Sequence, residues 1–125
     1  VLALWCYGLC RINPEVDKVV QHYYMNIVGP YWPPERHYID EKYETLPFPF
    51  AEQPAPEFYM KAEWDLNEFM GYLNTWSATQ RFQQMNEQNP LDMVRRLLVK
   101  TWGDPQQRLT LRWPLYLRLG KITVL

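Results

Sequence analysis

The sequence predicts a mixed α/β domain built on a small sheet, and three patterns carry this prediction. Residues 1–8 form a continuous apolar run that ends at a glycine, as a buried strand does. Residues 16–27 place apolar side chains at helical spacing. Residues 109–119 alternate apolar and polar side chains with the period of a strand. The whole chain, 1–125, has the length of a single domain with one hydrophobic core.

Composition and charge exclude several classes of partner. Hydrophobic residues make up 47% of the chain and charged residues 22%, as in an ordered soluble domain. With 13 basic and 14 acidic residues the formal charge is −1, which favours neither nucleic acid nor an anionic membrane as a partner. No apolar run approaches the roughly 18 residues of a membrane span. Two cysteines do not form a disulfide framework, so we expect reduced thiols and a cytoplasmic location.

The opening strand is predicted to be buried on both faces, as in a parallel sheet. Chains seldom start inside such a strand, so we expect these 125 residues to be a fragment of a longer protein. An apolar strand that lacks a neighbour has an open edge. We expect two copies to pair through residues 1–7 into a symmetric homodimer.

A helix is predicted to follow, capped by Asn13 and with Pro14 at its first position. Acidic side chains in its first turn meet the positive end of the helix dipole. Gly29 and Pro30 end the helix. The side chains that we expect to face the core are Val16, Val19, Val20, Tyr23 and Ile27.

Residues 30–57 contain seven of the eleven prolines, interleaved with aromatic side chains. Proline fixes φ and removes a backbone donor, which excludes long regular structure, although a short helix over 35–43 is compatible with the sequence. We interpret the segment as an ordered Pro/aromatic loop that lies over the body of the protein. Residues 46–50 could be a polyproline ligand for a partner, but their apolar density favours packing on the parent domain.

The rest of the chain predicts a strand, several helices and a final strand. Residues 58–64 alternate as a half-buried strand. Asp65 and Glu68 suggest a capping box for the next helix, and Ser77 is expected to cap a further helical segment. Asn89 opens another helix, whose inward side chains are expected to be Leu91, Val94, Leu97 and Leu98.

The last strand contains a proline and a row of arginines. Pro114 lies within the alternating run, and a proline inside a strand implies an edge position or a bulge. Arg108, Arg112 and Arg118 share one face of this strand. We expect a solvated or ion-paired face, because three arginines without a wider basic excess are only a weak signal for nucleic acid.

The usual catalytic signals are missing from the sequence. It contains no Gly-rich phosphate loop and no nucleophile elbow. Cys6 and Cys10 are too few for a metal site without further ligands, so we expect no metal and interpret both as structural. His37 lies in the Pro/aromatic loop beside Arg36 and is a candidate functional residue.

Residues 71–81 mix Tyr, Trp, Ser and Arg side chains on predicted helices. Such a mixture suits one side of a small-molecule pocket. An equally good interpretation puts Trp76 in the core and Arg81 in solvent.

Two long stretches resemble a known enzyme family. Residues 37–50, HYIDEKYETLPFPF, and residues 66–82, with the centre YLNTWSA, are similar to the trans-aconitate methyltransferase-like branch of class I S-adenosylmethionine-dependent methyltransferases. Residues 1–8 resemble the fifth strand of that fold, and residues 102–103 and 109–122 also fit.

The resemblance implies the C-terminal part of a Rossmann-like methyltransferase fold. In that fold the seventh strand runs antiparallel between the fifth and the sixth. Residues 1–7, 109–119 and 58–64 would then form a small three-stranded sheet in the order five, seven, six. The family's Gly-rich cofactor loop lies upstream of the fifth strand and is absent here. These residues would therefore hold the acceptor side of the enzyme and would be inactive alone.

The resemblance also implies a class of acceptor, and position and residue type then suggest candidate site residues. Methyl transfer from S-adenosylmethionine is a direct displacement, in which the protein mainly aligns donor and acceptor. A small carboxylic acid, as in trans-aconitate, is ionised at neutral pH and needs a cation rather than a general base. The candidate substrate-binding residues are Arg36, His37, Tyr72, Trp76, Ser77 and Arg81, and the candidate cofactor contact is Tyr7.

A second class of function is compatible with the same residues. The Pro/aromatic loop 30–57 could dock a partner without any catalysis. The chain would then be a binding or interaction module rather than part of an enzyme.

Overall fold

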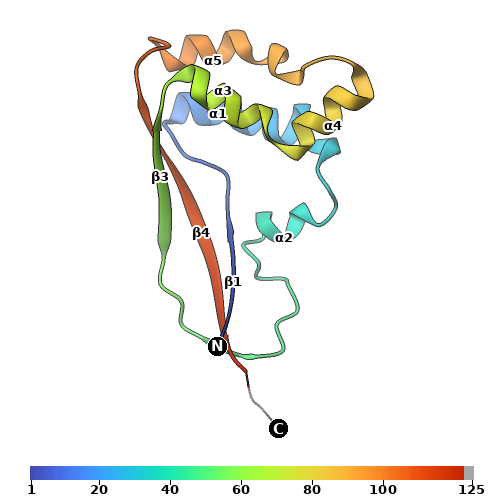
Figure 1. Ribbon diagram of the computed structural model, residues 1–125, viewed down its shortest axis with the longest axis vertical. Coiled ribbons are helices and arrows are strands. Elements are labelled where there is room, and N and C mark those ends of the chain that lie inside the picture. Colours follow the sequence, from blue (N-terminus) through green and yellow to red (C-terminus); the bar gives the residue numbers. More distant parts are fainter. Residues whose placement is uncertain (123–125) are drawn as a thin grey trace. The chain divides into compact units, whose positions relative to one another are not determined.

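The computed structural model describes residues 1–122, and the chain divides into two compact units. We call the first the sheet unit; it comprises residues 1–10, residues 34–61 and the chain from Arg112 on. The helical unit comprises residues 11–33 and 62–111. Each unit is described by itself below, and Figure 1 labels the main helices and strands.

The sheet has four strands, and its last strand lies at the centre. β4 (Leu109–Lys121) pairs with β1 (Leu2–Tyr7), with β2 (Ala51–Gln53) and with β3 (Phe58–Trp64). Figure 1 shows β4 between β1 and β3. The predicted order, with the final strand between the first and the strand at 58–64, is confirmed.

The expectation of three strands is wrong, because β2 adds a fourth within the Pro/aromatic loop. Residues 51–53 are a proline-free stretch between Pro49 and Pro54, so their backbone donors can join a ladder. β2 runs antiparallel to β4, with Ala51 opposite Lys121.

The first strand differs from the prediction in its burial. β1 runs antiparallel to β4, and its alternate side chains have different environments. Cys6 is buried, whereas Trp5 is 73% and Tyr7 46% exposed. One face is covered by the Pro/aromatic loop, from which Tyr43 donates a hydrogen bond to the Cys6 thiol. The exposed face carries an apolar hollow of about 370 Å³, lined by Ala3, Trp5, Phe58, Leu115, Leu117 and Leu119.

Pro114 lies in the central strand, so of the two expected settings the edge position is wrong, and a bulge would be the other way to accommodate the proline. The pairing of β1 with β4 runs without interruption to Tyr7 opposite Leu115. The next residue, Gly8, donates its N–H to Pro114 O at 2.9 Å. In an antiparallel ladder the N–H and C=O of one residue point to the same neighbour. The donor that Pro114 lacks would therefore face Gly8, just beyond the end of β1, and the ladder tolerates the loss without a bulge in this pairing.

The first helix begins as predicted and ends differently. The Asn13 side chain caps α1 (Pro14–His22) by accepting from Val16 N at 2.9 Å. A π-helical turn follows at Tyr23–Ile27, closed by a bond from Val28 N to Tyr23 O of 3.0 Å. A π-turn inserts one extra residue, which rotates the following positions. Val28 is consequently fully buried, and the expectation for Ile27 is wrong.

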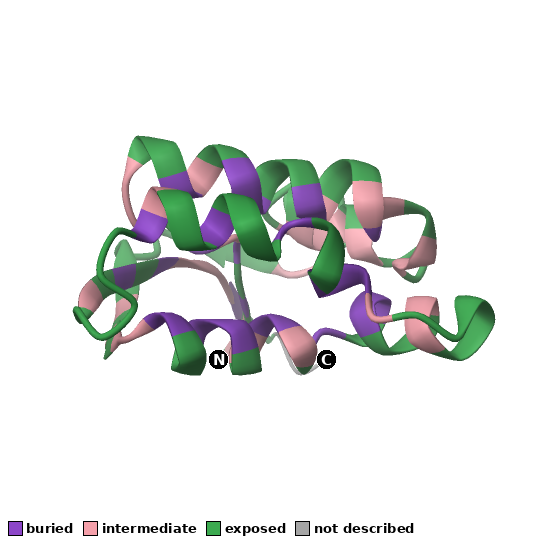
Figure 2. Cartoon of the chain, turned by 90° about the horizontal axis from the view of Figure 1, so that it is seen from above, coloured by how far each residue is buried: buried purple, intermediate pink, exposed green. Residues whose placement is uncertain are grey.

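The remaining helices form the rest of the helical unit. They are α3 (Leu66–Asn74), α4 (Ser77–Asn86) and α5 (Arg95–Trp102). Figure 2 shows their buried positions as stripes along the helices. The Asp65 and Glu68 side chains form the predicted capping box of α3. Asn89 accepts from Leu91 N at 3.0 Å and opens a 3₁₀ turn ahead of α5.

Two helix predictions fail for local reasons. Trp76, not Ser77, is the N-cap residue of α4, and no side-chain cap bond is made there. Leu97 is 47% exposed. The 3₁₀ turn ends at Val94 before α5 begins, so the inward stripe of α5 is set by Leu98 and Trp102, four residues apart.

The Pro/aromatic loop is ordered and short of regular structure, as predicted. Besides β2 it contains one short helix, α2 (Arg36–Asp40). Phe48 and Phe50 pack against Gly120 of β4, where a Cβ would stand 2.7 Å from the Phe48 ring. This contact confirms that residues 46–50 pack on the parent unit.

Candidate functional site

The sheet unit contains a largely apolar pocket of about 510 Å³. It lies between β1, α2 and the turn after α2, with one residue each from β3 and β4. The lining residues are Trp5, Cys6, Tyr7, Arg36, Ile39, Tyr43, Met60 and Leu115. Arg36 is the one charged side chain among these eight, so the pocket combines an apolar wall with a single guanidinium.

Tyr43 reaches this pocket through an unusual backbone turn. Lys42 and Tyr43 have φ angles of 59° and 63°, in the left-handed region that few residues other than glycine adopt. Tyr43 N donates to Tyr38 O at 2.7 Å and closes the turn. Non-glycine residues in this region cost about 1 kcal/mol or more each and persist where the surroundings hold them.

Arg118 holds that turn in place. Its Nη1 donates to Tyr43 O at 2.9 Å and to Leu46 O at 2.8 Å. Its Nη2 pairs with the Glu52 carboxylate, and its guanidinium lies 4.4 Å from the centre of the Phe48 ring. The Arg118 side chain is only 15% exposed. The interaction confirms the ion-paired prediction for Arg118 and fixes the loop on β4.

The polar groups of the pocket influence one another. Burial raises the pKa of the Cys6 thiol, while the Arg36 charge and the hydrogen bond from Tyr43 oppose that rise. Burial, followed by the neighbouring Cys6, raises the pKa of the Tyr43 hydroxyl. The thiol and the phenol are therefore both protonated at neutral pH. The pocket is lined by one cation, two tyrosines and one neutral thiol.

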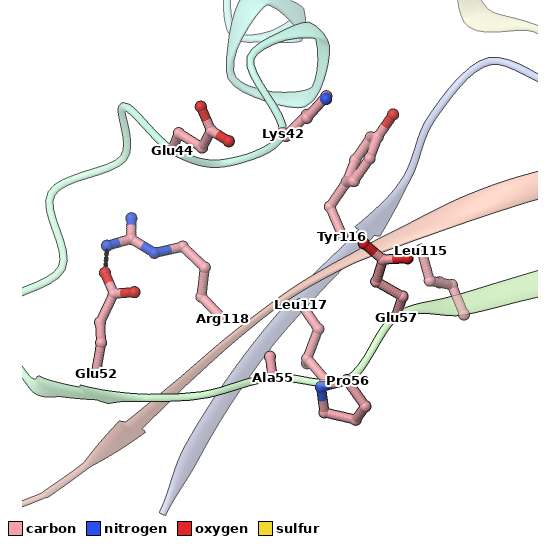
Figure 3. A pocket seen from close by; sticks show the side chains of 10 residues that line it. All are labelled: Lys42, Glu44, Glu52, Ala55, Pro56, Glu57, Leu115, Tyr116, Leu117 and Arg118. Atoms are coloured by element: carbon pink, nitrogen blue, oxygen red, sulfur yellow. Dashed lines mark hydrogen bonds and ion pairs between the residues drawn. The ribbon is translucent and has the colours of Figure 1, made fainter.

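A second hollow, of about 440 Å³, adjoins the same turn (Figure 3). Arg118 extends from β4 to Glu52 across it, and Lys42 Nζ lies 5.8 Å from the centre of the Tyr116 ring. Three glutamates, at positions 44, 52 and 57, line it together with these two cations. The positive and negative charges of this hollow largely neutralise one another. Its contacts hold the loop, and no single charged group is left to bind a ligand as Arg36 could in the first pocket.

The structure brings two of the predicted site residues together. Tyr7 and Arg36, 29 positions apart, line the same pocket. His37 follows Arg36 on α2 but is exposed, and its Nδ1–H donates to Pro34 O at 2.6 Å. Its ring also lies 4.0 Å from the Tyr38 ring. His37 therefore stabilises the start of α2.

The other four predicted residues belong to the helical unit. Trp76 is 9% exposed, with the rings of Trp32, Tyr24 and Tyr72 at 5.5–5.8 Å from its own. Ser77 and Arg81 are exposed on α4. Of the two interpretations of residues 71–81, the structure has the one with Trp76 in the core and Arg81 in solvent.

Of the eight lining residues, only Tyr7 and Arg36 are predicted site residues. The sequence predicts a structural role for Cys6, and Tyr43 enters the prediction only as part of the stretch 37–50. The left-handed turn at Lys42 and Tyr43 has no sequence signal, because neither residue is glycine or asparagine. The sequence feature that could have pointed to Tyr43 as a site residue is the family resemblance of residues 37–50.

The described residues hold neither a membrane-spanning helix nor a cluster of metal ligands. Residues 1–122 contain no helix with the length and apolar character needed to cross a bilayer. Over the same residues, no three His, Cys, Asp or Glu side chains gather as metal ligands would.

No family model matches the chain, but comparisons with known proteins find similar proteins among curated sequences and solved structures. A Dictyostelium discoideum protein named "Putative methyltransferase" is 29% identical over 127 residues, which are 96% of this chain and 48% of the relative. A solved structure described as a "Putative Type II Methyltransferase" from Anaeromyxobacter dehalogenans is 39% identical, with a TM-score of 0.89. The match covers 95% of this chain and 51% of the chain in the solved structure.

The chain is homologous to these methyltransferases. It spans about half the length of each of them. The four-stranded, mostly antiparallel sheet and its helices match part of a methyltransferase structure. This homology supports the family resemblance at the level of methyltransferases in general.

Proposed function

We propose that this chain is the acceptor-side portion of an S-adenosylmethionine-dependent methyltransferase that acts on a small carboxylic acid. The observation that carries the proposal is the homology along 95–96% of the chain to about half of two methyltransferases. The pocket with Arg36 supports the assignment to the acceptor side, because a guanidinium suits a carboxylate.

The pocket lacks the acidic groups that would bind the cationic and ribose parts of the methyl donor. Besides one carboxylate, S-adenosylmethionine carries an ammonium, a sulfonium and ribose hydroxyls, and carboxylate side chains are the groups that recognise cations and ribose. None of the eight lining residues is acidic. We therefore assign the pocket to the acceptor. Tyr7, the candidate cofactor contact, would then contact the acceptor instead, and the donor would be held by residues outside the pocket.

The proposed role of the pocket is to bind and orient. A carboxylate acceptor is already ionised at neutral pH, since unperturbed carboxyl groups have a pKa of about 4. Arg36 would hold it, and the apolar side chains of Ile39, Met60 and Leu115 would exclude water around it. Exclusion of water strengthens the ion pair and fixes the direction of the attacking oxygen.

The alternative of a non-catalytic binding module is less well supported. That alternative requires the Pro/aromatic loop to offer its rings to a partner. Phe48 and Phe50 instead pack on Gly120, and Arg118 ties the loop to β4.

Two titrations with S-adenosylmethionine test the proposal. Isothermal titration against the 125-residue chain is expected to give no micromolar binding. A chimera in which this chain replaces the matching half of the Anaeromyxobacter protein is expected to bind the donor and to methylate an acid. Micromolar binding by the isolated chain would contradict the acceptor-side assignment. A folded chimera that binds the donor but methylates none of a panel of acids would also count against it.

A further inference from the structure

The pocket has too little positive charge for a polycarboxylate. Arg36 is the single cation among its eight lining residues, and a trans-aconitate-like acid carries three carboxylates. Among these eight residues, the other two carboxylates would face Ile39, Met60 or similar apolar groups and would find no counter-charge. Burial of an unpaired carboxylate in apolar surroundings is strongly unfavourable. The charge count therefore disfavours the acceptor that the family resemblance implies.

The same lining suits an acid with a single carboxylate and an apolar body. The cavity of about 510 Å³ falls within the usual range for small-molecule pockets, roughly 300–1,000 Å³. Trp5 and Tyr7 are 73% and 46% exposed, so their rings can be covered by a ligand. Aromatic and aliphatic walls gain free energy when they bury an apolar ligand surface.

A hydroxyl donor lines the same pocket as the guanidinium. Tyr43 and Arg36 both line the pocket, and Tyr43 donates its hydrogen bond to the Cys6 thiol. Sulfur is a weak acceptor, whereas a carboxylate makes a charge-assisted bond that is about twice as strong as a neutral one. A bound carboxylate would therefore take the Tyr43 donor from Cys6. The left-handed turn at positions 42–43, held by Arg118, keeps Tyr43 in reach.

We propose that the pocket binds a monocarboxylic acid with an apolar, ring-sized body, with the carboxylate held by Arg36 and Tyr43. This inference rests on the proposed function for its identification of the ligand as the methyl acceptor. The binding itself requires no methyl donor. Arg36 is the specificity-determining residue for the charge of the acid, and Tyr43 is a second anchor for the same group.

Direct binding to the 125-residue chain tests the inference with three probes of similar size. They are 3-phenylpropionate, its neutral analogue 3-phenylpropionamide, and the tricarboxylate tricarballylate. Binding is followed by isothermal titration and by the change in tryptophan fluorescence. We expect 3-phenylpropionate to bind at least tenfold more tightly than either other probe. Tighter binding of tricarballylate, or equal binding of the acid and the amide, would overturn the inference.

Variants show whether the acid binds in this pocket. Arg36→Gln is expected to weaken 3-phenylpropionate binding at least tenfold, and Tyr43→Phe about threefold. Arg36→Lys keeps the charge but loses the forked geometry, and an intermediate loss is expected. Arg112→Gln removes an exposed arginine outside the pocket and should change nothing. Circular dichroism confirms that each variant is folded, and unchanged binding by folded Arg36→Gln would overturn the assignment.

The two proposals fail in different ways. If the chain binds the monoacid through Arg36 but the chimera binds no S-adenosylmethionine, the proposed function is wrong and the acid site stands. If the chimera methylates tricarboxylates and the chain ignores 3-phenylpropionate, the proposed function stands and the inferred class of acid is wrong.

Discussion

The Tyr23 hydroxyl lies 2.7 Å from Thr79 Oγ1, and both residues are fully buried in the helical unit although 56 positions separate them. Thr79 Oγ1 in turn donates to Leu73 O at 2.9 Å. A hydroxyl has one hydrogen to donate, so Tyr23 is the donor to Thr79. This chain of two hydrogen bonds links the π-turn to α3 and α4.

The phenol of Tyr23 should make stability depend on pH in the alkaline range. Burial raises the pKa of Tyr23 from 10.0 to about 12, so the unfolded chain loses this proton at a lower pH than the folded chain. The stabilisation that the buried, protonated phenol gives the folded state is complete below pH 10 and is lost as the pH rises toward 12. The free energy of unfolding should fall by about 1.4 kcal/mol per pH unit across that window.

Tyr23→Phe isolates this effect in chemical denaturation curves. Below pH 10 the variant should be about 1 kcal/mol less stable than the parent, because one buried hydrogen bond is lost. The difference should shrink and then reverse as the pH approaches 12, since phenylalanine has no proton to lose. Tyr59→Phe, at a position 59% exposed, serves as the control and should leave stability unchanged. A constant difference between parent and Tyr23→Phe at all pH values would refute this account.

Arg118→Met should loosen the Pro/aromatic loop. The variant removes the donors to Tyr43 O and Leu46 O and breaks the pair with Glu52. Glu52 is half exposed, so solvent screens the pair, and we expect a loss of about 2 kcal/mol in the free energy of unfolding. Hydrogen exchange of the amides at 43–53 should accelerate. The exposed Arg112 provides the matched control, and equal exchange in Arg118→Met and Arg112→Gln would argue against a holding role.

The pH dependence of Cys6 alkylation should change when the Arg36 charge is removed. Burial raises the pKa of Cys6 above the ordinary 9.0, and the Arg36 charge partly offsets that rise. Removing the cation in Arg36→Gln should therefore raise the pKa further. The pH midpoint of iodoacetamide alkylation, measured in a Cys10→Ser background, should lie above 9 and move upward in Arg36→Gln. A downward movement would mean that Arg36 does not stabilise the thiolate.

The free edge of β1 should promote self-association of the 125-residue chain. Gly8 N bonds to β4, so by alternation the N–H groups of Ala3 and Trp5 point away from β4. Residues Leu2–Tyr7 carry no charge to block pairing with a second copy, and the adjoining hollow is apolar. We expect light scattering to give twice the 15.2 kDa mass at high concentration.

Ala3→Pro tests whether that edge is the contact. Proline at this position removes an outward donor without taking a bond from β4, and the variant should be monomeric. Met25→Ala changes an exposed apolar residue of the helical unit and should leave the dimer intact. A parent chain that stays monodisperse at 15.2 kDa would rule out the pairing.

Local features of the sequence were sufficient to place several helix starts and the final strand. The caps at Asn13, Asp65 and Asn89 form as predicted, because a side chain that caps a helix bonds to an amide two or three positions away. The alternation of the final strand likewise needs no distant partner. The π-turn after His22 escaped prediction, since the burial of Val28 in place of Ile27 depends on what packs around it.

The sequence by itself determined three of the four strands, most of the helices and the position of the last strand between β1 and β3, and it identified Tyr7 and Arg36 as candidate site residues. The tertiary structure alone decided that Cys6 and Tyr43 share a pocket with them and that Trp76 is core. The physical reason is the distance along the sequence over which each kind of interaction acts. Caps and periodicities act over a few residues, whereas the pocket depends on a strained turn at Tyr43 that Arg118 holds from 75 positions away.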